Sequence, residues 1–162
     1  MGNSAKRLFF ALWPNEVVRG GLYGIQKSFG QVSARKLAPE LFHITLVYMG
    51  ASSAKDQSCY EEVADSVRLR SLNLTLDRTG FFRRAQVAFA APTEIPEVLL
   101  ELNEQLNQGL SQCDYERELR TYRPHVTLFR KYKLKTTPDL DFKVEWRVDR
   151  FALVESVSTN TG

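Results

Sequence analysis

The sequence is poor in the side chains that form metal sites or disulfide frameworks. It holds two cysteines, Cys59 and Cys113, in no CxxC or other paired spacing, and two histidines, His43 and His125. Zinc sites need three or four such ligands at characteristic spacing, and small secreted domains carry denser cysteine patterns. We therefore expect no metal, no cofactor and two free, reduced thiols, as in a cytoplasmic protein.

Long hydrophobic segments and a large net charge are also absent. The apolar stretch "LFFALW" at 8–13 is too short to cross a bilayer, and no apolar segment typical of a secretory signal precedes it. Lys and Arg outnumber Asp and Glu by 22 to 19. This weak positive charge is compatible with a phosphate-bearing partner without identifying one. We expect one domain over residues 1–162 that has no membrane association and acts as a monomer.

Strands and helices alternate along the chain. Apolar residues three or four apart predict helices, and continuous or alternating apolar runs predict strands. The predicted strands are 7–13, 42–49, 72–80, 85–92, 124–130, 141–148 and 150–157, with 72–80 and 85–92 as a hairpin. The predicted helices are 18–29, 60–67 and 96–113. Each half of the chain thus contains a strand, a helix and a histidine-containing strand, and we expect the two histidine-containing strands to meet at a shared centre.

Both histidines stand in copies of one four-residue pattern. His43 opens "HITL" and His125 opens "HVTL". Side chains alternate between the two faces of a strand, so each histidine shares a face with the threonine two residues later, which is Thr45 or Thr127. The apolar residues between them point to the other face. Because polar side chains on buried strands need a partner or a ligand, we expect the two imidazoles and two hydroxyls to face one cleft.

This set of side chains suits general acid–base catalysis at a phosphate. The imidazole pKa lies near neutrality, so one histidine can be neutral while the other is protonated. The neutral one can take a proton from a nucleophile, and the protonated one can give a proton to a leaving oxygen. Threonine hydroxyls can donate hydrogen bonds to an anionic phosphorus oxygen. The pattern therefore predicts phosphoester chemistry that needs no metal.

The sequence resembles the two-histidine (2H) phosphoesterases, in the branch of the bacterial RNA 2′,3′-cyclic phosphodiesterases and 2′-5′ RNA ligases. Their hallmark is a pair of H-x-[TS]-x motifs, matched here by "HITL" and "HVTL". Further segments that look like the family's own are 7–14, 37–50, 76–92 and 122–131. The resemblance implies an α+β fold of two pseudo-symmetric lobes, with antiparallel sheets lining a central cleft and helices outside. Family members usually continue with a strand after the equivalent of "FALVESVSTNTG", so one sheet is expected to lack a strand.

The resemblance also implies a reaction, namely hydrolysis of the 2′,3′-cyclic phosphate at an RNA end to a 2′-phosphate. The residue matching His43 is the proton donor, the one matching His125 is the proton acceptor, and Thr45 and Thr127 hold the phosphate. The same site would also serve a 2′-5′ RNA ligase or a 2′-5′ phosphodiesterase. A non-catalytic module that binds RNA or nucleotides remains the alternative from another class.

Arg130 is a further candidate for binding the substrate, because the resembled family commonly carries an arginine at this position. Strict alternation along 124–130 would place Arg130 on the face opposite His125, so it must lie where the strand bends or ends if it is to reach the phosphate. Other cations that could guide an RNA backbone are Arg83, Arg84, Arg123, Lys131 and Lys133. Aromatic residues that could stack on a base are Phe81, Phe82 and Phe129, although core packing is the commoner role of phenylalanine.

Overall fold

The computed structural model describes residues 5–157, which form nine strands, three α-helices and one short 3₁₀ helix. The strands are β1 (Lys6–Leu12), β2 (Arg35–Lys36), β3 (Ile44–Ser52), β4 (Leu72–Leu76), β5 (Arg78–Phe82), β6 (Val87–Ala91), β7 (Val126–Arg130), β8 (Val144–Val148) and β9 (Ala152–Ser156). The helices are α1 (Glu16–Ser28), η1 (Pro39–Leu41), α2 (Ala54–Ser66) and α3 (Glu97–Leu110).

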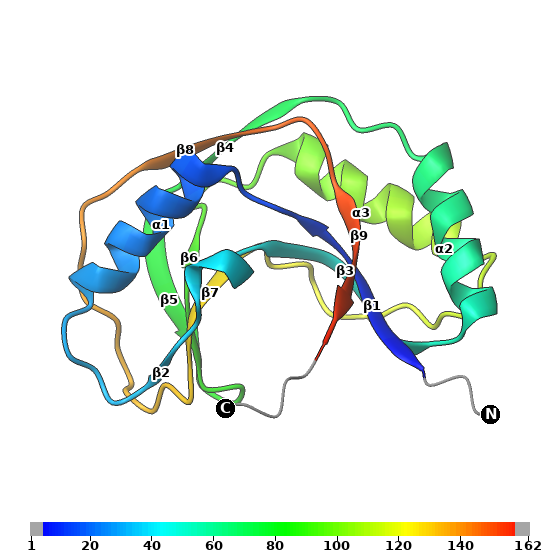
Figure 1. The fold of residues 1–162 in the computed structure, drawn as a ribbon. Coiled ribbons are helices and arrows are strands. Elements are labelled where there is room, and N and C mark those ends of the chain that lie inside the picture. Colours follow the sequence, from blue (N-terminus) through cyan, green and yellow to red (C-terminus); the bar gives the residue numbers. More distant parts are fainter. Residues whose placement is uncertain (1–4, 158–162) are drawn as a thin grey trace.

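The strands form two sheets in which every pairing is antiparallel. The larger sheet has the order β5-β6-β7-β3-β1-β9, with β2 paired to the far end of β7, and the smaller one pairs β4 with β8. Figure 1 shows two lobes, one built from β1, β3 and β9 with α2 and α3, and the other from β5, β6 and β7 with α1, β4 and β8. The predicted α+β class with antiparallel sheets is confirmed.

The lobes do not coincide with the two halves of the sequence. Helix α1 follows β1 in the chain but packs on β7. The ring of Phe29, the C-cap residue of α1, lies 4.9 Å from the Phe129 ring. Helix α3 precedes β7 but packs on β3, and its Asn103 side chain donates a hydrogen bond to the Leu46 carbonyl oxygen at 2.7 Å. Each histidine-containing strand is therefore covered by the helix from the other half of the chain.

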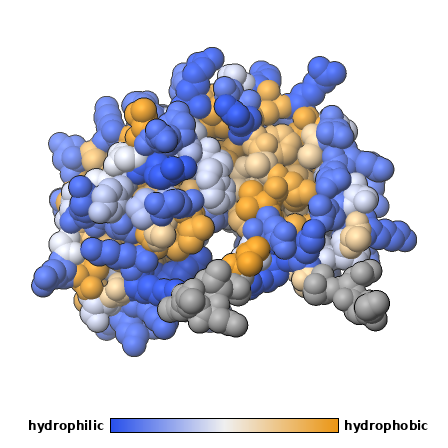
Figure 2. All heavy atoms as spheres, viewed as in Figure 1, coloured by the Kyte–Doolittle hydropathy of each residue, from blue (hydrophilic) through white to orange (hydrophobic). Residues whose placement is uncertain are grey.

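Local sequence explains where these helices begin and what they bury. The Asn15 side chain accepts a hydrogen bond from the Val18 amide and caps α1. In α2, Ser53 and Asp56 form a reciprocal capping box. The buried face of α1 carries Val18, Leu22 and Ile25, and that of α3 carries Leu99, Leu102, Leu106 and Leu110. On the face seen in Figure 2 the surface is mostly hydrophilic and is hollowed between the two lobes.

The prediction of one strand over 72–80 is wrong. The segment divides at Asp77 into β4, which pairs with β8, and β5, which pairs with β6. The Asp77 amide donates to the Ala91 carbonyl, and its carboxylate accepts from the Thr93 amide at 2.8 Å. These bonds hold the chain where it passes from one sheet to the other. The hairpin prediction is thus confirmed only for β5 and β6.

The last described strand lies at the edge of the larger sheet. The segment 150–157 yields β9, which pairs with β1 at the edge of the larger sheet. The expectation that one sheet lacks the strand after "FALVESVSTNTG" concerns the chain from residue 158 on, which lies outside the described residues. Within 5–157, every helix is too short or too polar to cross a membrane.

The prediction of two free thiols is wrong. Cys59 of α2 and Cys113, just after α3, form a disulfide with a sequence separation of 54 residues. The spacing gave no sign of this bond, because the two cysteines meet only when α2 packs beside α3, where Gly109 lies against Val63. The bond ties α2 to the segment that leads to the second histidine motif.

Removing this disulfide should lower stability substantially. A crosslink that closes a loop of this length is worth about 4 kcal/mol on the chain-entropy model. We expect the oxidised protein to unfold at a clearly higher denaturant concentration than the Cys59→Ser/Cys113→Ser variant, measured by circular dichroism. Adding a reductant should lower the midpoint of the wild-type protein and leave that of the variant unchanged. Equal midpoints for oxidised wild type and variant would mean that the disulfide contributes nothing.

Candidate active site

The two motifs meet where β3 and β7 adjoin. These strands share one paired position, Ile44 opposite Val126, and both side chains are fully buried. Extending this antiparallel register by one residue in each direction sets each histidine beside the threonine of the other motif. Because neighbours on a strand point to opposite faces, the two histidines and two threonines share the face opposite that core. The structure thus brings together the residues that the sequence singled out.

Both strands contain a β-bulge at the same place in the motif. In the β1–β3 ladder, Leu46 has no partner between Thr45 and Val47, and in the β6–β7 ladder Leu128 has none between Thr127 and Phe129. A bulge inserts one extra residue and shifts the alternation that follows it. The burial patterns of residues 43–48 and 125–130 are accordingly identical, with two consecutive buried residues followed by an exposed one.

The bulge in β7 explains how Arg130 can lie on the same face as His125, although strict alternation would place it on the opposite face. With Leu128 and Phe129 both buried, Arg130 returns to the face that carries His125 and Thr127. Its positive charge lowers the pKa of His43, so the guanidinium lies near that imidazole. Strict alternation gives the wrong face for Arg130, because a four-residue motif does not show where a strand contains a bulge. The same shift places Tyr48, the counterpart of Arg130 in the first motif, on the face of His43.

Each bulge is held by a side-chain amide from the helix that covers it. The Asn103 amide of α3 donates to the Leu46 carbonyl, and the buried Gln26 amide of α1 donates to the carbonyls of Leu128 and Leu37 at 2.9 Å each. Gln26 is 2% exposed. Helix packing therefore fixes the shape of both motif strands, a role that the sequence did not reveal.

Gln26→Leu should distort the second motif. The variant removes two hydrogen bonds, one to the partly buried Leu37 carbonyl and one to the buried Leu128 carbonyl, which together cost about 1–3 kcal/mol. We expect that loss in the free energy of unfolding, together with reduced activity because the β7 bulge loses a support. Chemical denaturation and initial rates measure the two effects. Gln108→Leu, which removes an exposed amide on α3, is the matched control and should change neither.

Both histidines are oriented by the same local hydrogen bond. His43 Nδ1 lies 2.6 Å from the Leu41 carbonyl oxygen, and His125 Nδ1 lies 2.8 Å from the Arg123 carbonyl oxygen, two residues upstream in each case. A carbonyl can only accept, so Nδ1 carries the hydrogen and Nε2 is left for the cleft. Nε2 can accept a proton when the ring is neutral and donate one when it is charged. The local structure suits either ring for either role.

Burial lowers the pKa of both imidazoles below 6.5, since desolvation disfavours the charged form. The carbonyl hydrogen bonds act in the opposite direction and are outweighed. The charge of Arg130 lowers the pKa of His43 further, and a charged His43 lowers that of His125. The two rings are therefore close enough to influence each other, and both are mostly neutral at pH 7 in the free protein.

Aromatic side chains surround each imidazole differently. The Trp13 ring stacks on His43 at 5.2 Å with an interplanar angle of 3°, and Phe9 lies 5.1 Å from the same ring. His125 instead meets Phe82 at 4.9 Å and Phe89 at 5.3 Å. Phe9, Trp13 and Phe89 were not among the candidates from sequence, because nothing in a strand sequence tells which aromatic residues face the neighbouring motif.

Two arginines lie opposite each other on the face of the sheet that carries the two histidines. Arg35 of β2 lies directly opposite Arg130 of β7 in the antiparallel ladder, an arrangement that destabilises a sheet unless an anion compensates it. Neither arginine forms an ion pair with a carboxylate in the part of the chain that the structure describes. Arg35 was not among the candidates from sequence, because β2 has only two residues and gave no strand signal.

The remaining candidates from the sequence lie in the core, on the surface or in a pocket beside His125. Phe129 is fully buried in the core and cannot stack on a base. Arg83 and Arg84 lie exposed in the β5–β6 turn, and Lys131 and Lys133 are exposed beyond β7. Phe81, Phe82 and Arg123 line a pocket beside His125.

Known proteins are similar to this chain over most of its length. A sequence model described as the 2′-5′ RNA ligase superfamily matches residues 24–160. A protein of Escherichia coli (strain K12) named RNA 2′,3′-cyclic phosphodiesterase is 28% identical over 153 residues, spanning 93% of this chain and 87% of the relative. A protein of the same name from Thermus thermophilus is 30% identical over 163 residues, spanning 93% of this chain and 81% of the relative.

A solved structure shares the fold. The crystal structure of E. coli LigT complexed with 3′-AMP aligns with a TM-score of 0.85 at 24% identity, covering 96% of this chain and 91% of the other. The alignment covers nearly the whole chain, so the two-lobed arrangement of Figure 1 is shared with that structure.

Proposed function

Because the chain belongs to the 2′-5′ RNA ligase superfamily, we propose that it is an RNA 2′,3′-cyclic phosphodiesterase that opens a terminal cyclic phosphate to a 2′-phosphate without a metal. The observation that carries the proposal is the matched pair of imidazoles. Each is oriented through Nδ1 by the carbonyl two residues upstream, and both lie on one face of the sheet. Its curated relatives carry this name.

In the proposed reaction the phosphate lies between the two rings. His125 takes a proton from water, whose oxygen attacks phosphorus in line. The bond from phosphorus to the 3′ oxygen breaks, and His43 gives a proton to that oxygen. Arg130 lowers the pKa of His43, which makes the protonated ring a stronger acid. Hydrogen bonds from Thr45 and Thr127 and the charge of Arg130 hold the phosphate oxygens, and the anion offsets the like charges of Arg35 and Arg130 on this face.

The test is the identity of the product. Purified, chelator-treated protein is incubated with an oligonucleotide ending in 2′,3′-cyclic phosphate, and the product is assigned by its ³¹P NMR shift and by its resistance to a 3′-specific phosphatase. A 2′-phosphate supports the proposal. A 3′-phosphate would reverse the proposed leaving oxygen, and tight binding without turnover would favour the binding module instead.

The rate should depend on pH in a way that the lowered pKa values define. The free enzyme must hold one protonated and one neutral imidazole, a state whose population is greatest between the two pKa values, both below 6.5. We expect kcat/KM to be highest below pH 6.5 and to fall as pH rises, because the acid loses its proton. A bound anion raises both pKa values, so kcat should persist to higher pH. Initial rates from pH 4.5 to 8.5 give both profiles, and a kcat/KM still level at pH 8 would contradict the lowered pKa values.

We further propose that the protein acts as a cytoplasmic monomer on RNA ends or nucleotides. Both motifs come from one chain, so one copy holds the whole site. The disulfide needs conditions that keep it oxidised. Alkylation of free thiols in freshly lysed cells measures how much of the cytoplasmic pool carries it, and size-exclusion chromatography with light scattering measures the mass in solution.

A further inference from the structure

The two-residue strand β2 is held in place against the end of β7. The Leu37 amide, just after β2, donates a hydrogen bond to the Leu128 carbonyl oxygen at 3.0 Å. The buried Gln26 amide donates to the carbonyl oxygens of both residues at 2.9 Å each. Arg35 of β2 then lies directly opposite Arg130. Because strands are usually longer than two residues, these side-chain and backbone bonds are what fix the position of Arg35.

Arg35 adds a positive charge beyond those that the reacting phosphate needs. Opposite residues of an antiparallel pair point to the same face, with Cβ atoms about 4.5–5.5 Å apart, so Arg35 shares the face of Arg130. It is exposed, and it forms no ion pair with a carboxylate within residues 5–157. A 2′,3′-cyclic phosphate carries a single negative charge, and Arg130 and protonated His43 already face it. The additional charge of Arg35 therefore suits a second anion.

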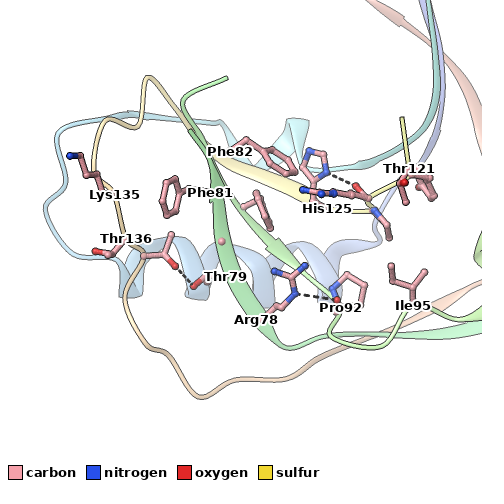
Figure 3. Close-up of a pocket in the computed structure, with 16 residues that line it drawn as sticks. Arg78, Thr79, Phe81, Phe82, Pro92, Ile95, Thr121, His125, Lys135 and Thr136 are labelled. Atoms are coloured by element: carbon pink, nitrogen blue, oxygen red, sulfur yellow. Dashed lines mark hydrogen bonds between the residues drawn. The ribbon is translucent and has the colours of Figure 1, made fainter. Parts of the chain in front are cut away.

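Arg35 lies at the His43 end of the site. Antiparallel pairing sets Thr127 beside His43, and β7 continues from there to Arg130. The charge of Arg130 lowers the pKa of His43, which agrees with this placement. The pocket of about 750 Å³ in Figure 3 begins at the other end of β7, since its lining includes His125 but no residue of β2 or β7.

The geometry of the proposed reaction indicates which anion Arg35 meets. The leaving 3′ oxygen belongs to the terminal ribose and receives its proton from His43, so this ribose lies on the His43 side of phosphorus. The C5′ atom of the same ribose carries the phosphate that joins the terminal nucleotide to the rest of an RNA strand. A nucleoside 2′,3′-cyclic phosphate without that group has no second anion to offer.

We propose that Arg35 binds the phosphate on the 5′ oxygen of the terminal nucleotide and makes the enzyme prefer the end of an RNA strand to a cyclic nucleoside phosphate, a proposal that rests on the function proposed above. Arg130 holds the reacting phosphate, and the guanidinium of Arg35 donates hydrogen bonds to the next phosphate along the strand. The two like charges thus meet two anions of one substrate. The planar fork of an arginine suits this contact better than a lysine would.

The test compares three substrates that share one terminal base. They are a nucleoside 2′,3′-cyclic phosphate, its 5′-phosphorylated form, and a dinucleotide that ends in the same cyclic phosphate. With the wild-type protein we expect kcat/KM to be about tenfold higher for each of the two longer substrates, the lower end of what a hydrogen bond to a charged group contributes. Arg35→Gln should bring both ratios close to unity. Because a ratio is measured, any effect of Arg35 on the reacting phosphate cancels.

Lys36→Gln is the matched control, because it removes the same exposed charge from the neighbouring residue of β2, which points to the other face. It should leave both ratios as they are in the wild type, whereas Arg35→Lys should retain part of each. Chemical denaturation shows that the variants are folded. Arg35→Gln should be at least as stable as the wild type, since it removes a like charge opposite Arg130.

Equal losses for all three substrates in Arg35→Gln would place Arg35 on the reacting phosphate alone and overturn the proposal, as would unchanged ratios. A ratio that falls for the 5′-phosphorylated nucleoside but not for the dinucleotide would mean that the site takes a terminal phosphate instead of an RNA strand, which also overturns it. A wild-type protein that hydrolyses none of the three substrates would instead contradict the proposed function.

Discussion

Alanine at either histidine should lower hydrolysis of a cyclic phosphate by about 10²–10⁴, the usual contribution of one acid or base. In the proposed in-line reaction one proton is taken on one side of phosphorus and the other is given on the opposite side, so the remaining imidazole cannot perform both transfers. The double variant His43→Ala/His125→Ala should therefore be little slower than the worse single variant, since the pair acts as a unit. Initial rates at several pH values measure the effect, and thermal unfolding shows that the variants are folded.

A leaving group that needs no proton separates the two roles. With a 4-nitrophenyl phosphodiester of a nucleoside as substrate, His43→Ala should regain much of its lost rate, because the leaving phenolate departs without an acid. His125→Ala should regain little, because the nucleophile still needs a base. Recovery of His125→Ala instead of His43→Ala would exchange the two assignments. Chelator-sensitive activity that survives in the double variant would mean that the chemistry takes place elsewhere.

Arg130→Ala should produce the next largest loss. Hydrogen bonds to charged groups contribute about 1.5–3 kcal/mol, which corresponds to roughly 10- to 150-fold in kcat/KM. The variant should also show a raised His43 pKa, because the guanidinium that now lowers it is gone. The alkaline side of the kcat/KM profile should therefore move to higher pH although the rate itself falls. A merely structural role for Arg130 would reduce the rate without this shift.

Two further variants sharpen the test of Arg130. Arg130→Lys keeps the charge but loses the planar fork, so it should restore the His43 pKa more fully than the rate. Lys133→Ala removes an exposed cation three residues away and should change neither quantity. If Arg130→Ala leaves kcat/KM within about twofold of wild type, Arg130 does not bind the reacting phosphate.

Sequence alone predicted what depends on short-range pattern. Alternation along "HITL" and "HVTL" placed each histidine with its threonine, and the ladder between β3 and β7 has the register that this requires. Helical spacing of leucines found α3, and the apolar run 42–49 found most of β3. These features follow from a period of two or of 3.6 residues, which a single sequence displays directly.

What sequence could not predict depends on contacts between distant segments. The bulges at Leu46 and Leu128 arise from pairing with β1 and β6 and from amides on the helices, so Arg130 appeared to face the wrong way. The bond between Cys59 and Cys113 needs α2 beside α3, and the spacing of the two cysteines carries no trace of that packing. Arg35 became visible only as the partner of Arg130 across β2 and β7.

The crossed placement of α1 and α3 has a consequence for how the protein folds. Neither half of the chain can bury its own helix, because α1 needs β7 and α3 needs β3. A fragment ending before β4 would leave the apolar face of α1 without its sheet, and the remaining fragment would leave α3 in the same position. The two lobes are therefore one cooperative unit that gains its stability only when the whole chain is assembled. Each histidine acquires its final environment in that same step.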